Sequence, residues 1–150
     1  MRLLPTVLLP LVLAVPSITH AAEGLTAVKS PHSVKVTLDR LEAAARERKL
    51  SIFARIDHAG GAQKIGKTLR PTELLIFGNP QGGTPLMECA QSAGIDLPLK
   101  ALAWEDAAGQ VWLGYNDMQY LARRHAAVDC PVVGNLAKAI AGLAAEATKP

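Results

Sequence analysis

Short apolar segments separated by proline and glycine constrain this fold more than any other feature of the sequence. The clearest is ELLIFG, residues 73–78, which is nearly all apolar and lies between Pro71 and the pair Asn79-Pro80. Proline and Asn-Pro interrupt regular structure, so the run is limited to the length of a β-strand. A continuous apolar run of that length is typical of a strand buried on both faces. We predict that residues 73–78 form a central strand.

Three further segments have strand patterns. Residues 51–57, SIFARID, alternate so that Ile56 and its apolar companions face one way while Arg55 and Asp57 face the other. Residues 99–105 and 111–116 are joined by a short loop that contains glycine, which predicts a β-hairpin. A short alternation at residues 25–28 predicts an additional strand near the start of the domain.

Most of the remaining segments have apolar residues at helical spacing or residue types that are common at helix starts. Ser33 begins a segment with apolar residues on one face, which predicts a helix to about Lys49. Thr84 and Pro85 have the residue types of an N-cap and a first helical position. Four helices are predicted after the first, at residues 62–69, from Pro85 to near Gly94, at 118–125 after Asp117, and at about 130–147.

The order of these elements predicts one α+β domain. Short strands, one of them in a hairpin, favour a largely antiparallel sheet with helices packed on one face. Residues 22–150 are enough for a single core, and no linker or internal repeat divides them. Because such a sheet leaves its other face uncovered, we expect a homodimer formed through that face.

The first 21 residues have the pattern of an export signal. Met1 and Arg2 precede an apolar run over residues 3–15, and Thr19-His20-Ala21 matches a small-x-Ala cleavage site. The run is short for a membrane span and contains two prolines. We therefore expect a signal peptide at residues 1–21, a mature chain at 22–150 without a membrane segment, and a periplasmic or secreted location.

The charge of the chain argues against a nucleic-acid partner. The full sequence has 16 basic and 13 acidic residues, and removal of Arg2 with the leader leaves about +2. The basic residues are scattered, and no run of them alternates with aromatic side chains. Neither an electrostatic patch for phosphates nor a stacking platform for bases is predicted.

Several motifs in order resemble a known family. They are FARIDHAGGA, LRPTELLIFGNPQGGTPLM, DLPLKALAWED and VWLGYND, and together they extend from about residue 33 to 125. The chain resembles the family called domain of unknown function 302 (DUF302). The resemblance implies an α+β domain with a curved antiparallel sheet, similar in architecture to the TATA-binding-protein-like fold, and often a homodimer. The family has no established activity, and the architectural resemblance says nothing about DNA binding. Relative to that pattern, the C-terminal helix is interpreted as an addition.

The first of these motifs contains a candidate binding site. Arg55 and Asp57 project from one face of a strand, His58 begins a turn, and Gly60-Gly61 permits close backbone approach. One interpretation is that Arg55 holds a small anionic ligand. The alternative is structural, with Arg55 and Asp57 paired to each other or to a facing strand. The candidate ligand-binding residues are Arg55, Asp57, His58, Asn79, Glu105 and Tyr115, with Glu105 also a candidate partner for Arg55.

The histidines allow a weaker hypothesis of a metal site. His58 and His125, with nearby aspartates, have the donor atoms that divalent metals use. No His-x-x-x-His or Cys-x-x-Cys spacing supports the idea, and no serine lies in a nucleophile-elbow pattern. The identity of any cofactor is therefore left open, as is the question whether the protein is an enzyme.

Cys89 and Cys130 are the two cysteines of the chain. In an exported protein an even number of cysteines favours a disulfide. A catalytic redox pair is the less favoured alternative, because the Cys-x-x-Cys turn that lowers a thiol pKa is missing. The sequence thus predicts a periplasmic ligand-binding or accessory module that dimerises. A metal-dependent or redox accessory enzyme using His58 or His125 and a purely structural dimer are the alternatives.

Overall fold

The computed structural model of the chain describes residues 22–150. The predicted signal peptide, residues 1–21, lies outside the described residues. Five strands form one sheet in the order β1-β5-β4-β3-β2, and every neighbouring pair is antiparallel. The strands are Leu25–Ser30 (β1), Ser51–Asp57 (β2), Thr72–Gly78 (β3), Leu99–Glu105 (β4) and Val111–Asn116 (β5).

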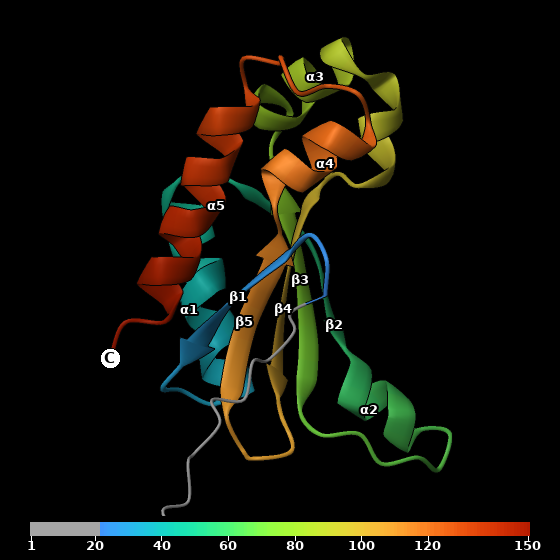
Figure 1. Cartoon of the computed structure of the whole chain (residues 1–150). Helices are drawn as coiled ribbons and strands as arrows, with labels where there is room; N and C mark the ends of the chain where they lie inside the picture. The colour runs from blue at the N-terminus through green and yellow to red at the C-terminus, as the bar shows by residue number, and fades with distance from the viewer. Residues whose placement is uncertain (1–21) are drawn as a thin grey trace, which may run out of the picture.

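Helices accompany the sheet on one face and at one end (Figure 1). The helices are Val34–Glu47 (α1), His58–Gln63 (α2), Pro80–Cys89 (α3), Met118–Arg124 (α4) and Val133–Ala147 (α5), with a 3-10 helix at Gln91–Ile95 (η1). Helices α1 and α5 lie side by side, and α1 packs on β2, β3, β4 and β5. Helices α3 and α4 lie at one end of the sheet, whereas α2 projects near the other end. The fold is therefore the predicted α+β domain.

The core lies between the sheet and the pair α1 and α5. Leu38 and Leu41 of α1 are fully or almost fully buried, as are Phe77 of β3 and Leu113 of β5. Their apolar surface is removed from water, which is the main favourable contribution to folding. One polar pair enters this core, because the hydroxyl groups of Ser30 and Thr37 lie 2.7 Å apart and satisfy each other.

The sheet is covered unequally on its two faces. Along β4, Ala101 and Ala103 are buried under the helices, whereas Leu102 and Trp104 lie on the opposite face and are only partly buried. Across that open face Trp104 stacks on Trp112 of β5 with ring centroids 6.5 Å apart. The hairpin predicted for residues 99–105 and 111–116 is confirmed, because β4 and β5 pair antiparallel. Among the described residues, no helix is long and apolar enough to cross a bilayer.

Two helices begin earlier than the sequence predicts, and in both cases a side chain caps the helix. Asp57 accepts a hydrogen bond from the amide of Gly60 at 2.8 Å, so α2 begins at His58 directly after β2. Asn79 accepts one from the amide of Gly82 at 2.9 Å, so α3 begins at Pro80 rather than at Pro85. The predicted starts at residues 62 and 85 were wrong, because the caps are Asp57 and Asn79. The predicted helix at residues 62–69 was also wrong at its other end, since α2 ends at Gln63.

Candidate ligand-binding site

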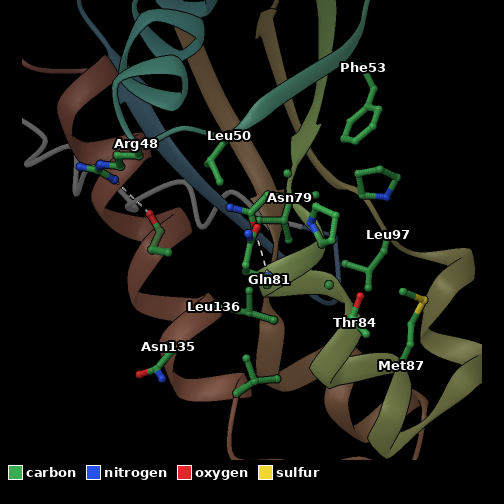
Figure 2. Close-up of a pocket in the computed structure, with 18 of the residues that line it drawn as sticks. Arg48, Leu50, Phe53, Asn79, Gln81, Thr84, Met87, Leu97, Asn135 and Leu136 are labelled. Carbon is green, nitrogen blue, oxygen red and sulfur yellow. Dashed lines mark hydrogen bonds between the residues drawn. The ribbon is translucent and has the colours of Figure 1, made fainter.

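A pocket of about 660 Å³ lies at the end of the sheet where α3 and α5 meet (Figure 2). Its wall comprises the N-terminal half of α3, one side of α5, the loop before β4, and the residues that follow α1. This volume is within the range of sites that bind compact organic molecules. The apolar lining residues are Leu50, Phe53, Pro80, Met87, Leu97, Pro98, Leu99, Val132, Leu136, Ala139 and Leu143.

The start of α3 forms one wall because two glycines allow a close approach. A Cβ atom on Gly82 would lie 3.2 Å from Cδ2 of Leu136 in α5, which is tighter than an ordinary contact. A Cβ atom on Gly83 would lie 3.6 Å from Cδ1 of Leu97. Small residues at these positions bring the backbone of α3 to the rim of the pocket. The Asn79 cap fixes where that wall begins.

A bulge in β2 supplies the side of the pocket that lies opposite the start of α3. The pairing of β2 with β3 shifts between Ile52 and Ala54, so Phe53 is the residue left out of register. Such a bulge changes the direction in which a side chain projects. Phe53 lines the pocket while remaining 59% exposed. The sequence alternation alone gave no sign of this shift.

The polar groups of the pocket lie mainly at its rim. Arg48 is the one charged side chain among the lining residues, and it follows the last turn of α1. Its Nη2 atom donates to Oε2 of Glu146 at 2.8 Å, and its Nη1 atom donates to the carbonyl of Ala139 at 3.4 Å. Gln81, Thr84 and Asn135 are exposed lining residues with hydrogen-bonding side chains. The pocket is therefore apolar in its interior with a small set of polar groups around it.

Arg55, the predicted anion-binding residue, is surrounded by carboxylates. Its Nη1 atom lies 2.6 Å from Oδ1 of Asp39, and its Nε atom lies 2.8 Å from Oε2 of Glu73. Glu42 lies slightly farther away, at 3.8 Å. Burial works against the charge of Arg55, but the hydrogen bonds that it donates to Asp39 and Glu73 outweigh this effect and raise the pKa of Arg55.

This cluster corrects the expectation for Arg55. Its partners are Glu73 on the facing strand and Asp39 on α1, so the predicted pairing with Glu105 was wrong. The alternative of a pair with a facing strand is confirmed. The same contacts act on the carboxylate. The pKa of Asp39 is lowered, chiefly by the hydrogen bond from Lys35 and next by the one from Arg55. The guanidinium already has its carboxylate partners, and no external anion is needed to balance its charge.

The structure does not bring the other predicted site residues together. Asp57 caps α2, and His58 is an exposed residue at the start of that helix. Glu105 ends β4, and its carbonyl accepts from Nε of Arg70 at 3.0 Å. Tyr115 is buried in the core on β5. Of the six predicted residues, Asn79 alone lines the pocket.

His58 and His125 do not form a shared site. His58 begins α2 and His125 directly follows α4, and these two helices lie near opposite ends of the sheet (Figure 1). Within residues 22–150, no three His, Cys, Asp or Glu side chains lie close enough to hold a metal ion. His125 instead joins a polar chain, with Nε2 at 2.6 Å from Oδ2 of Asp96 and Nδ1 at 3.0 Å from Oγ of Ser92. These hydrogen bonds tie the end of α4 to η1, and none of the three residues lines the pocket.

The predicted disulfide is present. Cys89, the last residue of α3, is bonded to Cys130 in the segment before α5, and their Cα atoms are 6.0 Å apart. The bond links two walls of the pocket, because the lining residues Thr84 and Met87 belong to α3 while Val132 directly precedes α5. Its position indicates a structural role.

Residues 26–143 match the family described as Domain of unknown function DUF302. The chain belongs to the DUF302 family. The match extends beyond the motifs at residues 33–125 and includes nearly all of β1 and most of α5. The C-terminal helix is therefore part of the family domain rather than an addition to it.

A solved DUF302 structure has the same fold. The crystal structure of an uncharacterized conserved DUF302 protein from Bacillus stearothermophilus superposes with a TM-score of 0.74, covering 85% of this chain and 100% of that chain. The sequences are 17% identical, so the likeness concerns the fold alone. It agrees with the predicted α+β class.

Longer curated proteins contain a similar segment. Fluoride-specific ion channel FluC 1 of Brucella suis biovar 1 and of Brucella abortus biovar 1 are each 52% identical to this DUF302 protein over 102 residues. The match covers 68% of this chain but 40% and 38% of those proteins. The chain thus spans about two fifths of the length of these relatives.

Sequence reasoning missed most of the pocket because its residues come from separated elements. One signal was available, since NPQGGTPLM combines a capping asparagine with two glycines inside a helix. Such glycines indicate close packing against a neighbour. Nothing in the linear sequence placed Arg48 and Leu136 beside that segment.

Proposed function

We propose that this DUF302 protein is a ligand-binding module whose site is the pocket between α3 and α5. The observation that supports this most directly is the 660 Å³ hollow, apolar inside and bordered by the amide groups of Asn79, Gln81 and Asn135. Sites for small organic molecules have this composition, with a few polar groups that orient a mainly apolar ligand. The ligand class proposed is a compact molecule with an apolar body.

The carboxylate cluster around Arg55 supports the same choice of site. A ligand anion at Arg55 would have to displace Asp39 or Glu73 from contacts of 2.6 and 2.8 Å. Leaving either carboxylate partly buried without its partner costs free energy. The pocket has no comparable cluster, because Arg48 is its one charged lining residue.

A pocket-filling substitution tests the proposal. Gly83→Leu adds an apolar side chain toward Leu97, and it favours helix formation at a position inside α3. We expect calorimetry to show that the unmodified protein binds 1-octanol and that Gly83→Leu does not. Gly134→Leu is the matched control, because Gly134 is in α5, has open space around it and does not line the pocket.

Either of two results would count against the pocket. The first is the absence of 1-octanol binding by the unmodified protein. The second is equal binding by the unmodified protein and Gly83→Leu. Gly134→Leu should bind 1-octanol as the unmodified protein does. This result would show that the loss in Gly83→Leu comes from filling the pocket and not from adding a leucine to a helix.

The activity of the Brucella proteins is not carried over to this chain. The match covers only 40% and 38% of those longer proteins, and their name concerns fluoride. A small, strongly hydrated anion requires several closely spaced donors in place of its water. A mainly apolar pocket with one arginine at its rim favours an organic ligand instead.

Export and dimerisation complete the proposed function. The Cys89–Cys130 disulfide supports an oxidising compartment, and the leader pattern at residues 1–21 supports the periplasm or secretion. The open face of the sheet supports a homodimer, since Leu74, Leu102 and Gly114 lie opposite one another along one row of that face. Two copies meeting there would bury the stacked tryptophans as well.

A further inference from the structure

We propose that the pocket selects an amphiphilic carboxylate, whose acid group binds Arg48 and whose apolar chain occupies the interior. This inference rests on the proposed ligand-binding function and names the ligand class. Its basis is the distribution of charge, because Arg48 is the one charged group among the lining residues and the remaining polar ones are neutral. A neutral apolar ligand would make no use of that cation.

The position of Arg48 suits a ligand with one polar end. Figure 2 shows Arg48 at one end of the lining and Met87 at the other, with Leu50, Asn79 and Leu136 between them. A chain laid along this direction would leave its carboxylate near Arg48 and bring its far end to Met87. Leu136 and Leu143 of α5 are buried and give the interior its apolar character.

The present partners of Arg48 are easier to replace than those of Arg55. The side chains of Arg48 and Glu146 are 42% and 40% exposed, and their contact is a single one at 2.8 Å. Exposed pairs of this kind contribute little to stability. A ligand carboxylate can take the place of Glu146, which remains hydrated when it is released. Glu146 therefore competes with a ligand carboxylate for the guanidinium of Arg48.

Two ligands of equal chain length test this inference. In calorimetric titrations we expect octanoate to bind at least about tenfold more tightly than 1-octanol, as a charge-assisted hydrogen bond implies. Arg48→Gln should remove that preference by weakening octanoate binding more than 1-octanol binding, and Arg48→Lys should retain part of it. Glu146→Gln should strengthen octanoate binding by about two- to fivefold. Arg46→Gln is the control, because Arg46 is exposed and outside the lining.

The outcomes separate this inference from the proposed function. If octanoate and 1-octanol bind equally, or if Arg48→Gln keeps the preference, the carboxylate assignment is wrong while the pocket remains a binding site. If neither compound binds, both are wrong. A preference for octanoate that is lost in Arg48→Gln and kept in Arg46→Gln supports the assignment.

Discussion

Arg55 occupies the most highly charged environment found among the side chains of the sheet. The side chains of Arg55, Glu42 and Glu73 are each about one quarter exposed or less, so removing the cation leaves carboxylates facing one another with limited solvent. We expect Arg55→Met to lower the free energy of unfolding by about 1–3 kcal/mol in urea titrations. The matched change Arg46→Met breaks an exposed pair with Glu42 and should cost about 0.3–0.5 kcal/mol. Equal effects of the two changes would contradict this account of the cluster.

The buried phenol of Tyr115 should make the free energy of unfolding depend on pH in the alkaline range. Burial, and to a lesser extent Asp117, raise the pKa of the Tyr115 phenol above its usual value. A group with a raised folded-state pKa stabilises the fold fully below the unfolded pKa of about 10, and this contribution is lost as pH rises through the folded pKa. Urea unfolding should show a steeper loss of stability above about pH 10 in the unmodified protein than in Tyr115→Phe. Parallel pH profiles would show that the phenol is not responsible.

Residue identities predicted these interactions only in part. Arg55 and Asp57 stand on one face of β2, and the alternative of a partner on a facing strand was correct for Glu73. Asp39 was not predicted as a partner because it reaches Arg55 from α1, which packs across the sheet. Contacts between layers depend on how helices lie on strands, and local alternation carries no information about that.

At the scale of elements, the disulfide has more influence on α3 than any other single bond does. Helix α3 packs chiefly on η1, and the bond to Cys130 connects it to the segment before α5. Replacing both Cys89 and Cys130 with serine should lower the free energy of unfolding by up to about 4 kcal/mol, from the loop that the bond closes. Hydrogen exchange should accelerate in α3 more than in β3. Uniform acceleration in both elements would contradict a local role for the bond.

The sequence predicted which elements exist better than where they begin. The hairpin, the central strand and the first helix are confirmed, because apolar periodicity and a Ser33 cap define them locally. The starts of α2 and α3 were wrong, since Asp57 and Asn79 cap helices that contain glycine pairs. Glycine pairs usually mark turns, and a capping side chain overrode that preference in both places.

At the scale of the whole molecule, the open face of the sheet is the proposed dimer interface. Leu102 lies on that face, so Leu102→Lys places a charge in the proposed contact while the side chain stays outside the core. We expect the unmodified protein to sediment as a dimer at micromolar concentration and Leu102→Lys as a monomer. Ala107→Lys, in the exposed hairpin loop, is the control and should remain dimeric. Sedimentation of the unmodified protein as a monomer would contradict the proposal.

The pocket could not be found from the sequence because it exists only in the assembled molecule. Its walls combine the end of α1, the bulge of β2, the start of α3 and one side of α5. The sequence correctly predicted the class of fold that brings these elements to one end. It placed the site instead at Arg55, where charge is most evident in the linear pattern.

The most direct test of the binding site is a nuclear magnetic resonance titration of the isotope-labelled protein with octanoate. We predict amide shift changes concentrated in residues 48–53, the first half of α3, residues 94–99 and the start of α5, which together form the pocket wall. Changes centred on Arg55, Asp57 and His58, or no localised changes at all, would contradict the account.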